Sequence, residues 1–338
     1  MSALSDADRA LPSWLHSPWQ QIQDNAARGR LGHALMLTGP EGVGKHLLAQ
    51  AIRELALCGE HAVPACGICR SCVVARAGNH ADDHEVLRPA DKKTISVEQI
   101  RELIGKLDLS PSYGNRKIGL IAPAETMTTA AANALLKTLE EPPGDALLIL
   151  VSHSTRALPA TVLSRCQRIE CAAPSYPEGR AWLTDALGSA EGDVCLSLAG
   201  GAPFQAEKYY NQGVESIYSS VIEDVSRLRL GRADVISVAS GWTDEHLDVR
   251  LRTLYSMIRQ LALEALDLEG ELAHKTDLQS LRQGRGEIKL SALLGYQDAV
   301  LRARARLDSP LNQQLMIEAL LAPWAEGLNS QGLEYQHQ

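Results

Sequence analysis

Short apolar runs alternate with helical patterns over the first 170 residues of the chain. The helical segments, such as 46–57 and 128–141, repeat apolar residues at intervals of three and four. Five short, nearly continuous apolar runs predict β-strands at 33–38, 84–89, 117–122, 146–151 and 166–171. Runs of this kind are typical of strands covered on both faces. The alternation predicts a parallel five-stranded sheet flanked by helices.

Beyond about residue 174 the strand pattern stops and only helical patterns follow. The segments 175–188 and 193–210 predict a short helical module, and a larger helical region follows it. In 245–266, apolar residues recur every three or four positions and predict one buried stripe: Leu247, Leu251, Leu254, Ile258, Leu261 and Ala265. Similar patterns predict helices at 214–229, 290–307 and 312–328, with a polar connector at 267–287.

The bulk composition is that of a globular protein with more than one domain. Its 338 residues are more than a single hydrophobic core usually contains, and 45% of them are hydrophobic while 22% are charged. No basic segment precedes an apolar run and no stretch of 18 apolar residues occurs, so we expect a cytoplasmic protein, neither secreted nor membrane-spanning. A net charge of -8 argues against a wholly basic nucleic-acid binder and leaves room for a local basic face.

The stretch GPEGVGKH, which begins at Gly39, follows a predicted strand and opens a predicted helix. This is the context of a phosphate-binding loop. Gly39, Gly42 and Gly44 allow backbone N–H groups to turn toward a polyphosphate, and Lys45 would neutralise its terminal phosphates. His46 replaces the hydroxyl that should end the motif, and magnesium prefers hard oxygen ligands. Two interpretations stay open: a loop that kept its turn and lost its ligand, or a weak nucleotide site.

ATP hydrolysis by such a loop needs acidic residues after the third strand, to hold magnesium and polarise water. Here those positions are occupied by Ala122 and Pro123, which can neither bind a metal nor accept a proton. Glu125 lies further along and is expected to be a first-turn helix glutamate rather than an inward-facing acid. The sequence therefore predicts that this chain does not hydrolyse ATP by itself.

Four of the seven cysteines, Cys58, Cys66, Cys69 and Cys72, crowd into fifteen positions. In a cytoplasmic protein this C-x7-C-x2-C-x2-C spacing indicates a metal site before disulfides. Four closely spaced thiolates are the ligand set of structural zinc, with no position left for water or substrate. We expect Zn2+ here, in an inserted module at about 58–80; the alternative is free cysteines. The other three cysteines lack this spacing and are expected to be buried as small apolar residues.

Arg165, in Ser-Arg-Cys just before the fifth predicted strand, indicates by itself only a surface ion pair at the carboxyl-terminal rim of the sheet. Other motifs change this interpretation. HALMLTGPEGVGK, the four-cysteine insertion, ISVEQIRELI, NALLKTLEEPP and SRC occur in one order over essentially the whole chain. Each is weak to moderate alone, and together they are specific. The sequence resembles the clamp-loader branch of the AAA+ ATPases, which acts in bacterial DNA replication.

The resemblance implies a recA-like AAA+ domain over 1–171, a small helical lid over 172–207 and a helical collar over 208–338. The collar would close a ring of five subunits. Implied partners are gamma or tau motor subunits and the delta subunit, and, through the assembled ring, the sliding clamp and primer–template DNA. In such a ring Arg165 projects into the ATP site of a neighbouring motor subunit as an arginine finger in trans.

Motor subunits of this branch end the glycine-rich loop in Ser or Thr and carry an acidic pair after the third strand. This chain has His46, Ala122 and Pro123 instead, and Phe204 stands near the place of a nucleotide-sensing arginine. These departures imply a rigid, non-catalytic stator. The intact Gly39, Gly44 and Lys45 leave ATP binding open.

Two other functions remain as alternatives. One is an ATP-hydrolysing motor of the same ring, which the missing carboxylates disfavour. The other is a zinc-bearing P-loop kinase or other phosphotransferase, which needs an acidic base and a pocket for the accepting group, and the sequence places neither near the loop. Basic residues are candidates for DNA phosphate contacts, with solvated surface charge as the competing interpretation: Lys92, Lys93, Arg101, Arg116 and Lys117.

Overall fold

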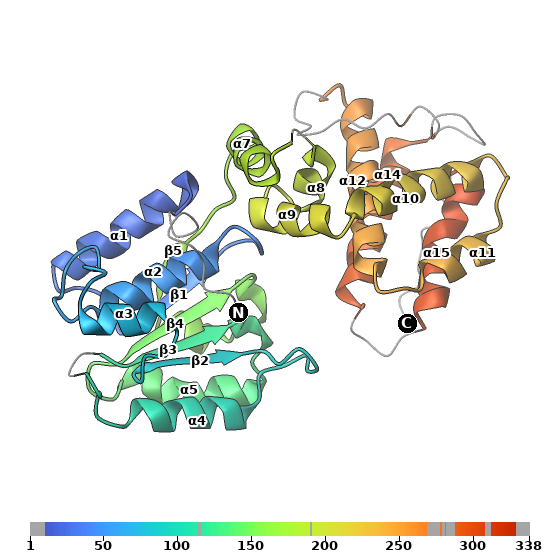
Figure 1. The fold of residues 1–338 in the computed structure, drawn as a ribbon. Helices are drawn as coiled ribbons and strands as arrows, with labels where there is room; N and C mark the ends of the chain where they lie inside the picture. Colours follow the sequence, from blue (N-terminus) through green and yellow to red (C-terminus); the bar gives the residue numbers. More distant parts are fainter. Residues whose placement is uncertain are drawn as a thin grey trace. The chain divides into compact units, whose positions relative to one another are not determined.

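The computed structural model describes residues 11–113, 116–189, 191–268, 278, 281, 288–307 and 312–328. The chain divides into two compact units, Met1–Pro174 and Ser175–Gln338 (Figure 1). Most of the connector predicted at 267–287 falls outside the described residues. The further division of the second unit into a lid and a collar stays a prediction.

Five parallel strands form the sheet of the first unit, in the order β2-β3-β4-β1-β5. Their bounds are Ala34–Thr38 (β1), Asp83–Leu87 (β2), Ile118–Ala122 (β3), Leu147–Ser152 (β4) and Gln167–Glu170 (β5). All five predicted strands are therefore confirmed, with ends that differ by at most two residues. The inner strands β1, β3 and β4 are almost wholly buried, whereas the edge strands β2 and β5 expose part of their length, so double coverage holds only for the inner three.

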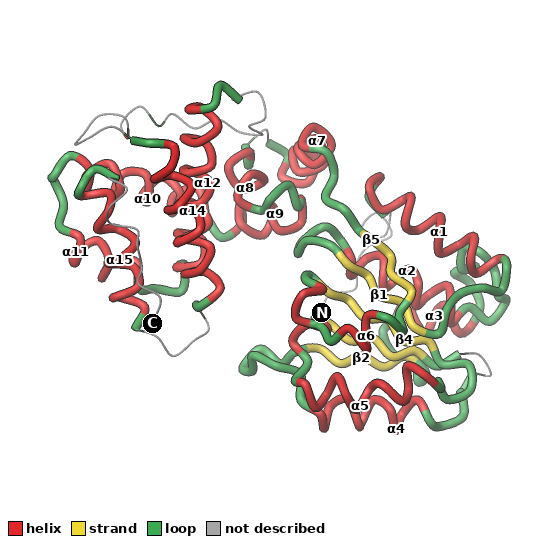
Figure 2. The backbone as a smooth tube through the Cα atoms, turned by 180° about the vertical axis from the view of Figure 1, so that it is seen from behind, coloured by secondary structure: helices red, strands yellow, loops and turns green. Residues whose placement is uncertain are grey.

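Helices cover both faces of this sheet (Figures 1 and 2). The helices of the first unit are α1 His16–Ala27, α2 Lys45–Leu57, α3 Arg70–Arg76, α4 Val97–Leu107, α5 Thr129–Glu140 and α6 Ala160–Leu163, with short 3-10 turns η2 Ser13–Leu15, η3 Ala124–Thr126 and η4 Thr155–Ala157. In both views α1 and α2 lie on one side of the strands, and α4 and α5 on the other. This three-layer arrangement places the start of α2 at the carboxyl end of β1.

Local sequence sets where the covering helices begin. Ser96 accepts the N–H of Gln99, whose side chain accepts the N–H of Ser96 in return, and this capping box starts α4. Thr128 accepts the N–H of Ala131 at 3.1 Å and caps α5. Both helices bury an apolar face against alternate sheet residues such as Met36. The Thr128 cap thus fixes the start of α5, the helix that ends at Glu140.

The second unit is helical throughout its described residues. Its helices are α7 Tyr176–Leu187, α8 Asp193–Leu198, α9 Pro203–Asn211, α10 Val214–Arg229, α11 Val235–Trp242, α12 Leu247–Ala265, α14 Leu290–Ala305 and α15 Gln313–Ala325. The predicted stripe on α12 is confirmed except at its last member, Ala265, which is exposed; Met257, in the middle of the helix, is buried in addition. Helix α11 was not predicted. No described helix combines the length and apolar character that crossing a membrane requires.

Asp82, just before β2, is a fully buried carboxylate. It accepts backbone N–H groups from Ser112 at 2.8 Å and Tyr113 at 3.0 Å, and the Nζ of Lys117 lies 3.5 Å away. Burial alone would raise the pKa of Asp82. The two N–H donors and the Lys117 charge outweigh it, so the pKa lies below its ordinary value. The carboxylate therefore holds the loop at 112–113 against the edge of the sheet.

We expect Asp82→Asn to lower the free energy of unfolding at pH 7 by about 3 kcal/mol, because it leaves the Lys117 ammonium buried without its counter-charge. A depressed carboxyl pKa stabilises the fold above the ordinary value and loses that stabilisation as pH falls through the folded value. Wild type should therefore lose more stability than the variant on acidification below about pH 4. Urea unfolding at several pH values measures this. Asp145→Asn, which removes the exposed partner of Arg116, is the control; equal losses in both variants would contradict the prediction.

Candidate functional site

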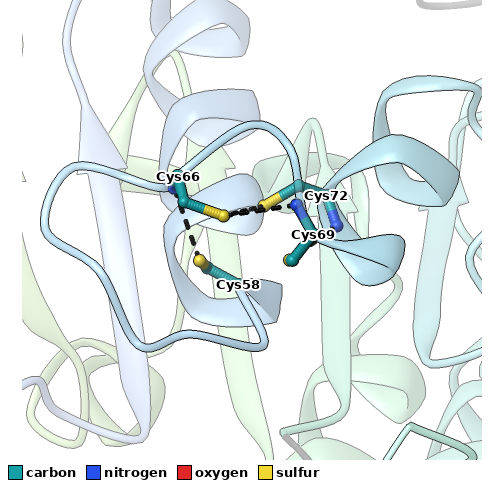
Figure 3. Close-up of side chains that lie close together, drawn as sticks. All are labelled: Cys58, Cys66, Cys69 and Cys72. Carbon is teal, nitrogen blue, oxygen red and sulfur yellow. Dashed lines mark hydrogen bonds between the residues drawn. The ribbon is translucent and has the colours of Figure 1, made fainter.

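Four cysteines within fifteen positions of the chain come together where α2 ends and α3 begins. Their Sγ atoms all lie within 4.8 Å of one another (Figure 3). Cys58 directly follows α2, Cys66 lies in the connecting loop, and Cys69 and Cys72 begin α3. None of them is in a disulfide, and Cys58 and Cys72 are buried. The structure thus brings the four predicted ligands together in a cluster that can hold a metal ion.

Backbone N–H groups point at three of the four sulfur atoms. The Sγ of Cys58 accepts from the N–H of Cys66, and that of Cys66 accepts from Cys69, each at 3.4 Å. Cys69 accepts from both Cys72 and Gly59, also at 3.4 Å. The N–H of Cys72, reinforced by that of Gly59, lowers the pKa of the Cys69 thiol to about 6. These donors stabilise thiolate, which is the form of cysteine that binds metals, whereas burial raises the pKa of the Cys72 thiol.

The spacing of the sulfur atoms fits a tetrahedral cation. A metal held by four thiolates at about 2.3 Å places the sulfur atoms about 3.8 Å apart, and the Sγ atoms of Cys66 and Cys72 are 4.0 Å apart. Gly67 turns the chain between them with φ 73°, and a Cβ there would lie 2.5 Å from the Nη2 of Arg76. Four protein ligands leave no position for substrate, so a metal here has a structural role.

A buried hydrogen-bonded chain ties this module to the end of α2. The Nδ1 of His80 accepts the N–H of Asp82 at 3.1 Å, so the neutral ring carries its proton on Nε2 and donates it to Ser71 Oγ at 2.8 Å. Ser71 in turn donates to the carbonyl of Leu57 at 2.5 Å. Burial lowers the pKa of His80 and favours this neutral form. Sequence reasoning missed Ser71 and His80, because nothing in the pattern distinguishes them from exposed polar residues.

The glycine-rich loop has the backbone of a phosphate-binding turn. Gly39, Gly42 and Gly44 have φ of 145°, 78° and 94°, a region that favours glycine. A Cβ on Gly39 would lie 2.0 Å from the carbonyl oxygen of Cys171, so glycine is also required there for close approach. The loop leads directly into α2, which starts at Lys45. The predicted residues therefore lie together at one helix N-terminus.

Lys45 bonds to the loop that precedes it. Its Nζ donates to the carbonyls of Gly39 at 2.6 Å and Pro40 at 2.5 Å, and only 2% of the residue is exposed. Burial lowers the pKa of Lys45 to about 8, although nearby acidic groups, including Glu125 and Glu41, oppose the shift. The ammonium is thus satisfied by the protein's own backbone.

Two imidazoles, those of His46 and His153, lie near Lys45 together with the Glu125 and Glu41 carboxylates. Burial, followed by the neighbouring His153 and Lys45, lowers the pKa of His46, so its ring is neutral at pH 7. Glu125 accepts the N–H of His153 at 3.0 Å. Glu125 is a first-turn residue of η3, as expected, and because β3 and β4 are neighbours their carboxyl ends also bring it to His153. Ala122, at the end of β3, is buried and offers no ligand.

Arg165 lies at the amino-terminal ends of the strands, whereas this loop follows the carboxyl end of β1. The prediction that Arg165 lies at the carboxyl-terminal rim was wrong, because Arg165 precedes β5 and all five strands are parallel. Its Nε and Nη2 donate to Oε1 of Glu140 at 2.9 and 2.5 Å, and its Nη1 donates to the carbonyl of Thr161 at 2.9 Å. The surface ion pair that an isolated arginine would suggest is therefore present.

Several other residues singled out in the sequence form ion pairs, pack against an aromatic ring or are buried. Lys117 is buried beside Asp82, and Arg116 pairs with Asp145, so neither is a free surface charge. Phe204, in the second unit, packs against Trp182 with ring centroids 4.4 Å apart and ring planes tilted by 55°. Cys171 and Cys195 are buried as expected, while Cys166 is partly exposed.

The five-stranded parallel sheet, the P-loop at the carboxyl end of β1 and the helical second unit define an AAA+ class P-loop protein. The family model for DNA polymerase III, delta subunit, matches residues 15–175, and the model for the C-terminal part of that subunit matches 215–326. A curated delta' subunit is 35% identical to this chain over 97% of its own length, so the chain belongs to the DNA polymerase III subunit delta' family.

Curated relatives agree over most of their length. DNA polymerase III subunit delta' of Pseudomonas aeruginosa is 35% identical over 318 residues, which cover 91% of this chain and 97% of the relative. The delta' subunit of Escherichia coli is 28% identical and 93% covered. The tau subunit of Salmonella typhimurium is 29% identical over 90% of this chain, which spans only 49% of that relative. The resemblance that the motifs indicated is confirmed.

Proposed function

We propose that this chain is a non-catalytic stator of the bacterial replicative clamp loader, within the DNA polymerase III holoenzyme. It would join gamma or tau motor subunits and the delta subunit in a ring of five, and help load the sliding clamp onto primed DNA. The observation that carries the proposal is the end of β3. Ala122 and Pro123 stand where hydrolysis needs carboxylates, in a chain that otherwise keeps the phosphate loop.

The surroundings of the loop support the same role. His46 offers a neutral imidazole where magnesium needs a hydroxyl oxygen, and Lys45 is bonded to its own loop. The position of Glu125 favours the alternative, an ATP-hydrolysing motor, since its carboxylate is close enough to raise the pKa of Lys45 against the effect of burial. Its bond to the His153 N–H supports a structural use of that carboxylate.

Arg165 would act in trans as an arginine finger. The P-loop follows the carboxyl end of β1, whereas Arg165 precedes the amino end of β5, so the finger cannot serve its own loop. In a ring, the edge that carries Arg165 would meet the nucleotide site of a neighbouring motor subunit. There the guanidinium would offset charge on the transferred phosphate.

We assign Zn2+ to the four-cysteine cluster, held by Cys58, Cys66, Cys69 and Cys72. The thiolate donor set and the sulfur spacing support zinc over hard cations such as magnesium, which prefer oxygen. The ion would lock the insertion between α2 and α3 and take no part in chemistry.

A calorimetric titration of the zinc-loaded chain with Mg-ATP, followed by a phosphate-release assay on the same sample, tests the proposal. We expect no binding, or binding without turnover, because the carboxylates after β3 are missing. His46→Ser is a matched variant: it restores the hydroxyl ligand, so it should bind Mg-ATP more tightly than wild type and still not hydrolyse it.

Steady ATP turnover by the lone wild-type chain would rule out the stator and favour an ATP-hydrolysing motor or a phosphotransferase. Co-purification with gamma or tau and delta separates those two outcomes, since only the motor joins the ring.

A further inference from the structure

The side chain of Arg165 is folded back onto its own unit rather than extended from it. Its Nε and Nη2 both bond Oε1 of Glu140, and its Nη1 bonds the carbonyl of Thr161, four residues earlier in the chain. Only a third of the side chain is exposed. A finger in this pose reaches along its own surface and not toward another subunit.

Two helices hold the guanidinium in place. Glu140 is the last residue of α5, and Thr161 belongs to the short α6, which ends just before Ser164. The carbonyl of Thr161, near the end of α6, also accepts from the Oγ of Ser164 at 3.2 Å, so Arg165 adds a second donor to this group. The retracted pose is therefore favoured by two independent contacts.

The Glu140 carboxylate occupies the donors that a phosphate would need. Guanidinium binds carboxylates and phosphates through the same forked N–H groups, and here the Nε–H and Nη2–H side of the fork is directed at Glu140. A phosphoryl group of a neighbouring subunit's nucleotide must break the two hydrogen bonds to Oε1 of Glu140 to gain the same contacts.

We propose that Glu140 is a positioning residue for Arg165: it holds the finger retracted and competes with the phosphoryl group for it. This inference rests on the proposed role of Arg165 as a finger in trans. Side-chain exposures of 33% for Arg165 and 51% for Glu140 make the ion pair weak and sensitive to salt. The hold is weak enough for a polyphosphate to break it and strong enough to lower the population of the extended finger.

The test is ATP hydrolysis by rings reconstituted from the full chain, motor subunits and delta, with and without primed DNA. We expect Glu140→Ala to raise the DNA-independent kcat about two- to fivefold, the range that loss of an exposed ion pair supports, and to leave KM for ATP unchanged. Glu140→Gln, which keeps an acceptor oxygen and loses the charge, should give a smaller increase. Glu141→Ala removes the adjacent charge, for which no described bond to Arg165 exists, and should behave as wild type.

A double variant shows whether Glu140 acts through Arg165. The Glu140→Ala and Arg165→Ala pair should have the rate of Arg165→Ala alone, which a general loosening of α5 would not produce. A Glu140→Ala rate equal to or below wild type, in a ring where Arg165→Ala is slow, overturns the inference and leaves the finger intact. If Arg165→Ala itself has no effect, the proposed function fails first. Thermal melting and gel filtration of each variant ring establish that assembly is unchanged.

Discussion

Arg165→Ala in a reconstituted ring is expected to slow ATP hydrolysis in the neighbouring motor subunit by on the order of 10³-fold, or about 4 kcal/mol in the barrier. An arginine finger stabilises charge that develops on the transferred phosphate, and alanine offers no replacement. The measurement is DNA-stimulated phosphate release by rings that carry either the variant or the wild-type chain, at saturating ATP. Arg165→Lys keeps the charge but loses the forked N–H groups, so it should recover only part of the rate.

The fold itself should tolerate the change. Arg165 and Glu140 form an exposed pair, whose loss costs at most about 1 kcal/mol of unfolding free energy. The variant should therefore purify, bind zinc and join the ring as wild type does, and melting curves with gel filtration verify this. An unchanged rate in a correctly assembled variant ring would rule out the finger.

Cys69→Ser is expected to release the metal and to loosen residues 58–80 before the main sheet melts. Cys69 accepts two N–H groups and caps α3, so its loss removes a ligand and a helix cap together. Structural zinc contributes on the order of 10 kcal/mol to a site of this kind, and here that free energy is confined to one local insertion. Zinc content per chain and hydrogen exchange of the insertion against β3 and β4 measure both effects.

Cys166→Ser is the matched control, because Cys166 lies outside the cluster and is partly exposed. It should keep one zinc per chain and normal protection of the insertion. Stoichiometric zinc that persists in Cys69→Ser would show that the site does not need four thiolates. Loss of protection across the whole sheet would show instead that the module is not an independent unit of stability.

Local features of the chain were predictable because their contacts are close in sequence. The strands were found from nearly continuous apolar runs of six residues, and the glycines of the P-loop from their spacing before Lys45. The α12 stripe failed only at Ala265, the last residue of the helix, which is exposed. The four cysteines span fifteen positions, so a single loop suffices to bring them together.

By itself the sequence determined the class of the fold, the family, the four-cysteine cluster and the absence of carboxylates at Ala122 and Pro123. These depend on residue type and short spacing, which backbone geometry converts directly into position. The strand order β2-β3-β4-β1-β5 was decided only by the tertiary structure, and with it the meeting of Glu125 with His153. The same holds for the ion pair between Arg165 and Glu140, 25 residues apart. Such contacts follow from which strand ends and helix ends become neighbours in space, and no local pattern of side chains encodes that.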